Sequence, residues 1–400
     1  MNPKAMPKCW LLLGCMTLFL MALDGLILVP FGAAIATQAG VGAGSAGYLT
    51  GAYALAAALS SLLLARFRVW GGNNQALVLA SLLGLGVSTL LFTAVQAFPA
   101  LLALRALAGF SAGVLAVANL RYQLLVGQGA EIKQRSAKLL SMYPLALTLG
   151  VPGLLWLSGT QNWRLGLQLL GGLCLVLCLA WAWAPRQQGT QPGQAGAPAL
   201  DSRGRRRLAV AALLVFVTVL ATFVMSTQLP VMLVQRLHSS DSLLQLSYLA
   251  GGAGTVLLMQ AYGRYAQRLA FLPLMLALSL LMVASSALAL FSLSSALAAA
   301  MFVLFMMASA TRTLVVVSEV LAGADGAERP RLVALQNALQ HGAVGVGGSL
   351  GSLALNHGLP GQLAYHQLLA LGAVLTLLGP VCVWLWHRAR GALATVAGPA

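Results

Sequence analysis

Long runs of apolar residues, separated by short polar or glycine-rich stretches, dominate this chain of 400 residues. A helix needs about 20 residues to cross a bilayer, and the pattern predicts about twelve such segments. They cover 10–36, 46–65, 74–96, 101–125, 137–158, 164–184, 208–235, 243–262, 271–291, 295–321, 332–356 and 363–386. Helices satisfy their own backbone hydrogen bonds in lipid, so we predict an all-α polytopic membrane protein.

Several short patterns occur twice, with partners about 200 residues apart. The pairs are Tyr48-Leu49-x-Gly51 with Tyr248-Leu249-x-Gly251, Gly129-Ala130-Glu131 with Gly326-Ala327-Glu328, and Trp163-Arg164 with Tyr365-His366. Both members of each pair lie inside or between apolar segments. Parallel repeats in a membrane protein predict two pseudo-symmetric six-helix bundles with a binding site at the seam between them.

A polar tract at 185–207, rich in Gly and Gln and ending in an arginine cluster, divides the chain. Such a tract has no core to bury, so we expect a flexible linker whose arginines lie at the anionic inner leaflet. The predicted organisation is an N-terminal bundle over 1–184, a linker over 185–207 and a C-terminal bundle over 208–400.

Composition excludes an ordinary soluble domain, because 60 % of the residues are hydrophobic and only 8 % are charged. The formal net charge of +16 would fit a nucleic-acid partner, but its placement argues against one. Nearly all basic residues fall at alternate ends of the predicted spans, and the opposite ends hold only Arg164 and Arg236. This asymmetry predicts that both termini and the central loop lie in the cytoplasm. We expect a multi-pass protein of the bacterial inner membrane.

The five cysteines lie in or beside the spans and lack the neighbours of a metal site, so we expect packing roles and neither metal nor cofactor. Leu12-Leu13-Gly14-Cys15 superficially resembles a lipoprotein signal. Cleavage there would destroy the twofold pattern, so we interpret the first helix as an uncleaved span.

Asp24 is the strongest single candidate for a residue that takes part in proton coupling. It lies about 14 residues into the first span, roughly 21 Å along a helix, near the bilayer centre. No other carboxylate is predicted at that depth, and an ionised Asp there costs about 3 kcal/mol. Desolvation favours its protonated form, which suggests a proton acceptor, and Pro30 would loosen the helix beside it. The alternative is a structural Asp bonded to nearby backbone.

The eleventh span carries a polar face, which we expect to line a central cavity. Its members are Gln336, Asn337, Gln340 and His341. His341 would either share proton handling with Asp24, since imidazole titrates near neutral pH, or only form hydrogen bonds. Weaker candidates for the substrate cavity are Tyr48, Tyr53, Asn119, Tyr143, Thr222, Ser226 and Gln228.

Four motifs make the chain resemble the major facilitator superfamily, particularly its twelve-helix drug:proton antiporter branch. They are Arg105-x-x-x-Gly109-x-x-x-Gly113, Gly150-x-Pro152-Gly153, Glu131 through Arg135, and Trp163-Arg164. The resemblance covers nearly the whole chain. It departs from the family in the loop after the second span, where Arg66 stands in a stretch without the usual acid. The second-half equivalent, from Gly263 to Arg268, has Gln in place of Asp, which weakens the implied gating network of charges.

The resemblance implies that Arg105 takes part in proton transfer or binds anionic groups. The alternative is that its side chain reaches the outer interface. Arg312 and Glu319 share a face of the tenth span. They would pair across an inner gate, or form an interfacial pair without function.

We therefore expect a secondary transporter and not an enzyme. It would export a small molecule, such as a drug, a metabolite or a siderophore, in exchange for protons, by alternating access and as a monomer in the lipid bilayer. A proton symporter for uptake is the alternative within transport. An integral-membrane enzyme or a receptor is disfavoured, because no cluster of acids and histidines and no large loop is present. A cationic substrate would compete for Asp24, and an anionic one would prefer Arg105 and Arg312.

Overall fold

The computed structural model describes residues 8–66, 74–124, 135, 138–139, 141–184, 202–265, 269–323, 329–357 and 362–394. All regular structure within these ranges is helical, which confirms the predicted all-α polytopic fold. The helices are α1 (Lys8–Leu26), α2 (Leu28–Gln38), α3 (Ala46–Arg66), α4 (Asn74–Ala94), α5 (Phe98–Leu124), α7 (Met142–Leu145), α8 (Val151–Ser158), α9 (Trp163–Ala182), α10 (Ser202–Ser226), α11 (Leu229–Gln235), α12 (Asp241–Tyr265), α13 (Phe271–Phe291), α14 (Ser295–Ala322), α15 (Arg329–Asn356) and α16 (Gln362–Ala394). Two short segments, the 3₁₀ turn η1 (Ala43–Ser45) and the π-helical η3 (Ala146–Gly150), complete them.

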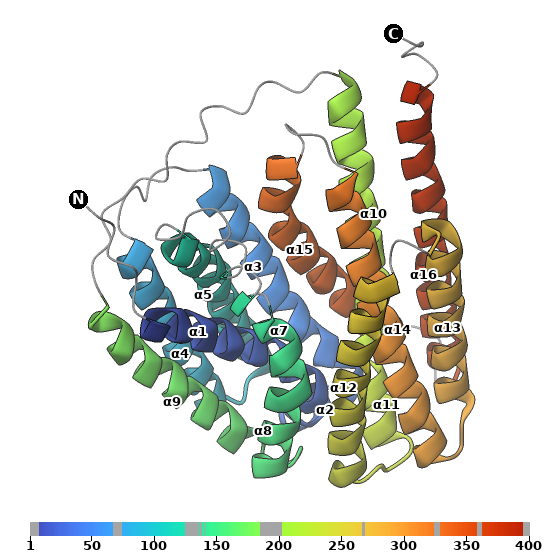
Figure 1. The fold of residues 1–400 in the computed structure, drawn as a ribbon. Coiled ribbons are helices and arrows are strands. Elements are labelled where there is room, and N and C mark those ends of the chain that lie inside the picture. The colour runs from blue at the N-terminus through green and yellow to red at the C-terminus, as the bar shows by residue number, and fades with distance from the viewer. Residues whose placement is uncertain are drawn as a thin grey trace, which may run out of the picture.

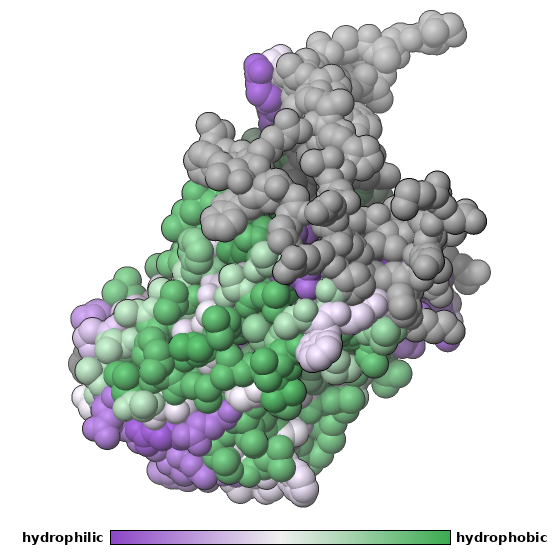
Figure 2. Space-filling view, turned by 90° about the vertical axis from the view of Figure 1, so that its left-hand side faces the viewer, coloured by the Kyte–Doolittle hydropathy of each residue, from purple (hydrophilic) through white to green (hydrophobic). Residues whose placement is uncertain are grey.

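Ten helical segments in the described part of the chain are long and apolar enough to cross a membrane. Two predicted spans are not among them: Met142–Ser158 is short, and α15 is rich in glycine and polar residues. Figure 2 shows a broad hydrophobic band over the visible surface, with hydrophilic side chains gathered below it. Trp156 and Trp183 are 75 % and 85 % exposed on α8 and just after α9, as expected for side chains that face lipid or its interface.

The first and seventh spans are each interrupted at an equivalent place. The first span breaks at Ile27, three residues before Pro30, and the seventh breaks at 227–228, just before Pro230. Proline has no N–H, so the carbonyl groups of Leu26 and Ser226 lose their helical donors. The two prolines are about 200 residues apart, so they extend the sequence repeat to backbone geometry.

Each half packs in a matching order. In the first half α5 lies against α3 and α4, and α4 lies against α9, while in the second half α14 lies against α12 and α13, and α13 lies against α16. Between the halves, α3 runs along α15 and α12 contacts α8 and η3 (Figure 1). These two contacts are equivalent under exchange of the halves, which fits the predicted pseudo-symmetry.

Two helices extend beyond the predicted spans. Helix α10 begins at Ser202, inside the predicted linker, and α16 continues to Ala394. Arginine is a good helix former, so the arginine cluster continues the helix that the apolar segment after it establishes. Arg205 and Arg206 are exposed on this extension. The rest of the predicted linker, 185–201, lies outside the described residues.

We name the two ends of the molecule by the helices found there (Figure 1). The linker face is the end at which α10 begins and α16 terminates. The opposite face is the end at which α12 begins. Side chains at the opposite face hydrogen-bond between the halves. Thr160 donates to the carboxylate of Asp241 through its hydroxyl at 2.5 Å and its backbone N–H at 3.2 Å. Gln245 donates to the Leu155 carbonyl at 3.0 Å. These bonds close one side of the opposite face.

The other side of the opposite face is closed by an equivalent set of bonds. Asn356, at the end of α15, donates to the Ser45 hydroxyl at 2.7 Å. Gln228, at the break in the seventh span, donates to the carbonyl of Gly44 and to the hydroxyl of Ser352. The halves are therefore held together at this face by polar contacts on both sides of the pseudo-dyad.

Replacing Asp241 by Ala should favour separation of the halves at the opposite face, because hydrogen bonds to a charged acceptor contribute about 1.5–3 kcal/mol. The ratio of separated to closed molecules should rise about tenfold or more. Spin labels on the exposed positions Leu157 and Leu246, in a background without native cysteines, would measure the distance between the halves. Ser242→Ala, an exposed change in the same helical turn, should leave the distances unchanged. Equal distance distributions in Asp241→Ala and the parent protein would contradict this role.

Candidate functional site

The candidate site is built around Asp24, which lies in the last turn of α1, directly before the break at Ile27. The side chain is fully buried. A carboxylate at this depth needs strong compensating contacts, because an isolated charge in hydrocarbon is expensive.

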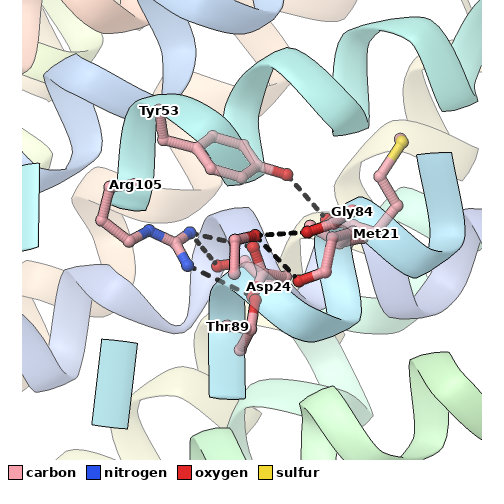
Figure 3. Close-up of polar contacts among 8 residues, drawn as sticks. Met21, Asp24, Tyr53, Gly84, Thr89 and Arg105 are labelled. Carbon is pink, nitrogen blue, oxygen red and sulfur yellow. Dashed lines mark hydrogen bonds and ion pairs between the residues drawn. The ribbon is translucent and has the colours of Figure 1, made fainter. Parts of the chain in front are cut away.

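Arg105 on α5 supplies that compensation. Its Nη2 donates to Asp24 Oδ2 at 2.9 Å and to the Asp24 carbonyl at 3.1 Å, and its Nη1 donates to Asp24 Oδ1 at 3.3 Å (Figure 3). Both side chains are 0 % exposed. The two charges therefore form a buried, two-pronged ion pair inside the first half.

Two neighbouring side chains complete the cluster. Thr89 on α4 donates to Asp24 Oδ1 at 2.9 Å. The ring of Tyr53 on α3 lies over the guanidinium of Arg105, 4.7 Å from its centroid, and the Phe92 ring lies at 5.6 Å. Within the described part of the chain, the Nε of Arg105 has no hydrogen-bond partner. The cation is thus held by the carboxylate on one side and by aromatic faces on another.

Glycines on α5 allow this arrangement, because they bring α5 into backbone contact with α3. A Cβ at Gly109 would overlap the carbonyl of Tyr53, and one at Gly113 would overlap the Ala57 carbonyl and the Ser60 hydroxyl. Small residues at this spacing are the usual device for close helix packing in membranes. Their position one and two turns after Arg105 brings Arg105 and Tyr53 together.

These contacts bear on the alternative interpretations that the sequence left open for Arg105 and for Asp24. Arg105 is buried within the first half, so the alternative that its side chain reaches the outer interface is wrong. Among the described residues, the bonds to the Asp24 carboxylate come from the side chains of Thr89 and Arg105 on other helices, and not from nearby backbone as its structural alternative supposed.

The expected pair of Arg312 with Glu319 is not formed. Arg312 is fully buried on α14 and donates to the carbonyls of Thr218 and Thr376 and to the sulfur of Met282. A Cβ at Gly379 would lie 2.5 Å from its Nη2, so the guanidinium fills the space of that missing side chain. The expectation was wrong because the side chain turns towards α10, α13 and α16.

Several predicted cavity residues instead join helices. Asn119 is fully buried and donates to the carbonyl of Gly14, and Tyr53 is 6 % exposed. Asn337 donates to the Ser61 hydroxyl across the seam between the halves, and Gln228 lies in the contacts of the opposite face. Thr222, by contrast, bonds within its own helix α10, to the Thr218 carbonyl. Partly exposed positions are Tyr48, Tyr143, Ser226, Gln336, Gln340 and His341.

The predicted motif Gly150-x-Pro152-Gly153 coincides with a change of helix type. Residues Ala146–Gly150 are π-helical and the α-helix resumes at Val151. Pro152 cannot donate to the carbonyl of Thr148, which favours a local change of hydrogen bonding. A Cβ at Gly252 on α12 would lie 2.7 Å from Thr148, so this irregular turn touches the second half.

The other predicted gating residues are only partly described. Glu131 and Arg268 lie outside the described residues, as does the side chain of Arg66. Arg135 is buried, and Gly263 has open space around it.

Sequence analysis missed Thr89, Asp241 and Thr160. Thr89 carries no local signal, because hydroxyl side chains are common in membrane helices. Asp241 did carry a local signal, because it is an acid in the first turn of a helix, on the side of the membrane predicted to hold few charges.

Replacing Arg105 by Gln should lower the free energy of unfolding by about 3–5 kcal/mol, because the ionised Asp24 would be left buried and unpaired. The double variant Asp24→Asn with Arg105→Gln should recover more than half of that loss. Denaturant unfolding in detergent at pH 8 would measure both values as a double-mutant cycle. Simple addition of the two single losses would show that the pair is not energetically coupled.

Known proteins share this architecture. Among curated proteins, none matches the sequence. Many solved structures share the fold. A bacterial homologue of the human lysosomal transporter Spinster, inward-facing and unoccupied, has 15 % identity and a TM-score of 0.74 over 96 % of this chain and 97 % of its own.

A point mutant of the nucleoside transporter NupG is 13 % identical with a TM-score of 0.73, covering 95 % of this chain and 99 % of its own. A D-xylose–proton symporter is 12 % identical with a TM-score of 0.68, covering 92 % and 96 %. At such low identity these structures support the fold alone. The family model described as Major Facilitator Superfamily matches residues 14–318, so the chain is a multi-pass membrane transporter that belongs to this superfamily.

Proposed function

We propose that this transporter couples the movement of a small molecule to the movement of protons, with Asp24 as the proton site. The observation that carries the proposal is the buried pair of Asp24 and Arg105. Asp24 is the acid that lies deep in a membrane helix of the described chain, and a charge kept at this depth usually serves ion or substrate movement.

The pair supports coupling because its two members respond differently to a proton. Asp24 becomes neutral when it is protonated, whereas Arg105 keeps its charge at any accessible pH. A protonated Asp24 leaves the buried guanidinium without a counter-charge, which is costly in a low-dielectric interior. The first half therefore has two electrostatic states that favour different arrangements of α1 and α5. A transporter can use such a difference to link protonation to alternating access.

We further propose that transport is export by antiport, as in the drug:proton antiporter branch. The motif that carries this resemblance, Gly150-x-Pro152-Gly153, begins at the last residue of the irregular turn η3, and both η3 and the following α8 contact α12. The molecule would work as a monomer in a bacterial inner membrane with both termini in the cytoplasm, so the opposite face would be external. Symport would use the same pair with substrate moving in the other direction.

The contacts of Asp24 limit which substrates could bind to its carboxylate. Its carboxylate already accepts three hydrogen bonds from Arg105 and Thr89. A cationic substrate would have to displace Arg105 to reach it. We therefore propose that Asp24 binds the proton and that the substrate, such as a drug, a metabolite or a siderophore, binds elsewhere at the seam.

Replacing Asp24 by Asn should abolish substrate-driven proton movement, because the amide fills the same space and takes up no proton. Purified protein in liposomes containing a pH-sensitive dye would be challenged with a panel of candidate drugs and metabolites. The sign of the pH change would separate antiport from symport. Ser88→Ala, which removes hydrogen bonds to the Gly84 and Leu85 carbonyls of its own helix and leaves the ion pair intact, should retain coupled flux. Unchanged coupled flux in folded Asp24→Asn protein would remove Asp24 from the mechanism.

A further inference from the structure

Helix α3 connects the buried ion pair to the seam between the halves, because it meets a helix on each side at backbone distance. On one side, Gly109 of α5 leaves no room for a Cβ against the carbonyl of Tyr53. On the other side, Cβ atoms at Gly47 and Gly51 would overlap the Gly348 carbonyl and the Ser349 hydroxyl of α15. Few side-chain atoms lie between these backbones, so side-chain rearrangement cannot accommodate a shift of α3, and the neighbouring helices must move with it.

Tyr53 is the point where α3 touches the ion pair. Its side chain is 6 % exposed, and its ring covers the guanidinium of Arg105. Its hydroxyl donates to the Met21 carbonyl of α1 at 3.3 Å (Figure 3). A single side chain of α3 therefore contacts both α5 and α1, the helices that carry Arg105 and Asp24.

We propose that Tyr53 is a positioning residue that transmits the protonation state of Asp24, through α3, to the contact with α15. The inference rests on the proposed function, in which Asp24 takes up a proton. It replaces the expectation that Tyr53 lines the substrate cavity.

The guanidinium of Arg105 responds to the protonation of Asp24. When Asp24 is neutral, Arg105 loses its charged acceptor, and the ring face of Tyr53 becomes its main compensation. A cation–π contact in a dry site contributes enough to change an equilibrium about tenfold. A movement of the guanidinium therefore carries the Tyr53 ring with it. Because α3 packs without a gap on α15, the displacement reaches the other half.

The groups around Asp24 are consistent with this route. Arg105 on α5 pairs with its carboxylate, Thr89 on α4 donates a hydrogen bond to it, and the ring of Tyr53 on α3 covers Arg105. Among the described residues, Cys174 on α9 and Tyr143 on α7 also interact electrostatically with this cluster. Neither bears a positive charge that could replace Arg105.

The test compares three variants that keep Asp24 and Arg105. Tyr53→Phe keeps the ring and removes only the hydroxyl. Tyr53→Leu removes the ring, and Tyr53→Met, made in parallel, fills its space with a flexible chain in case the leucine variant does not fold. Each is reconstituted without substrate. Infrared difference spectra between pH 8 and pH 5 report protonation of the buried carboxyl, with Asp24→Asn as the blank.

The same samples, without native cysteines and spin-labelled at the exposed positions Leu59 on α3 and Leu353 on α15, report the geometry of the seam. In the parent protein and in Tyr53→Phe, the ratio of the two distance populations should change about tenfold between the two pH values. In Tyr53→Leu and Tyr53→Met it should change less than about twofold, although Asp24 still takes up its proton.

The outcomes separate the two proposals. If Asp24 is protonated and the ring-less variants respond like the parent, the role of Tyr53 is overturned and the proton site stands. If no carboxyl band is lost in Asp24→Asn, or if Asp24→Asn keeps the parental distance change, the proton site itself is overturned, and the role of Tyr53 with it.

Discussion

A buried charge must have a partner, and in this protein that constraint organises the first half. Asp24 and Arg105 come from helices separated in sequence by α2, α3 and α4, and their pairing fixes how α1 lies against α5. Thr89 and Tyr53 bring α4 and α3 to the same point. The pair is therefore a structural hub as well as a candidate site for chemistry. Its cost in a low-dielectric interior is offset by several hydrogen bonds and by aromatic faces.

Close backbone contact between helices is the second constraint, because it connects the ion pair to the seam between the halves. Gly109 and Gly113 let α5 touch α3, while Gly47 and Gly51 let α3 touch α15. In lipid there is no hydrophobic drive between helices, so such contacts are stabilised by packing at short range. They also form a nearly rigid path from the ion pair to the seam. The hydrogen bonds of Asp241 and Asn356 close the same seam at the opposite face.

The halves repeat in architecture but differ in electrostatics. Pro30 and Pro230 interrupt equivalent helices, and ring contacts join equivalent helix pairs: Phe92 with Trp163 joins α4 to α9, and Phe291 with His366 joins α13 to α16. The buried arginines do not correspond. Arg105 has a carboxylate, whereas Arg312 has two carbonyls and a thioether. A proton taken up at Asp24 therefore changes the charge of a pair in one half alone, and movement of the two bundles need not be symmetric.

The amino-acid sequence determined ten of the twelve predicted spans, the repeat and the individual candidates, because membrane helices depend on local hydropathy and on motifs such as that of Gly109 and Gly113. It named Asp24 and Arg105 separately but not as partners. It placed Asn119 and Tyr53 in a cavity, although both are buried between helices. It also paired Arg312 with Glu319 on a shared helical face. Which way a side chain on such a face turns depends on the rotation and separation of neighbouring helices. Those are set by packing between segments far apart in the chain, so only the tertiary structure decided them.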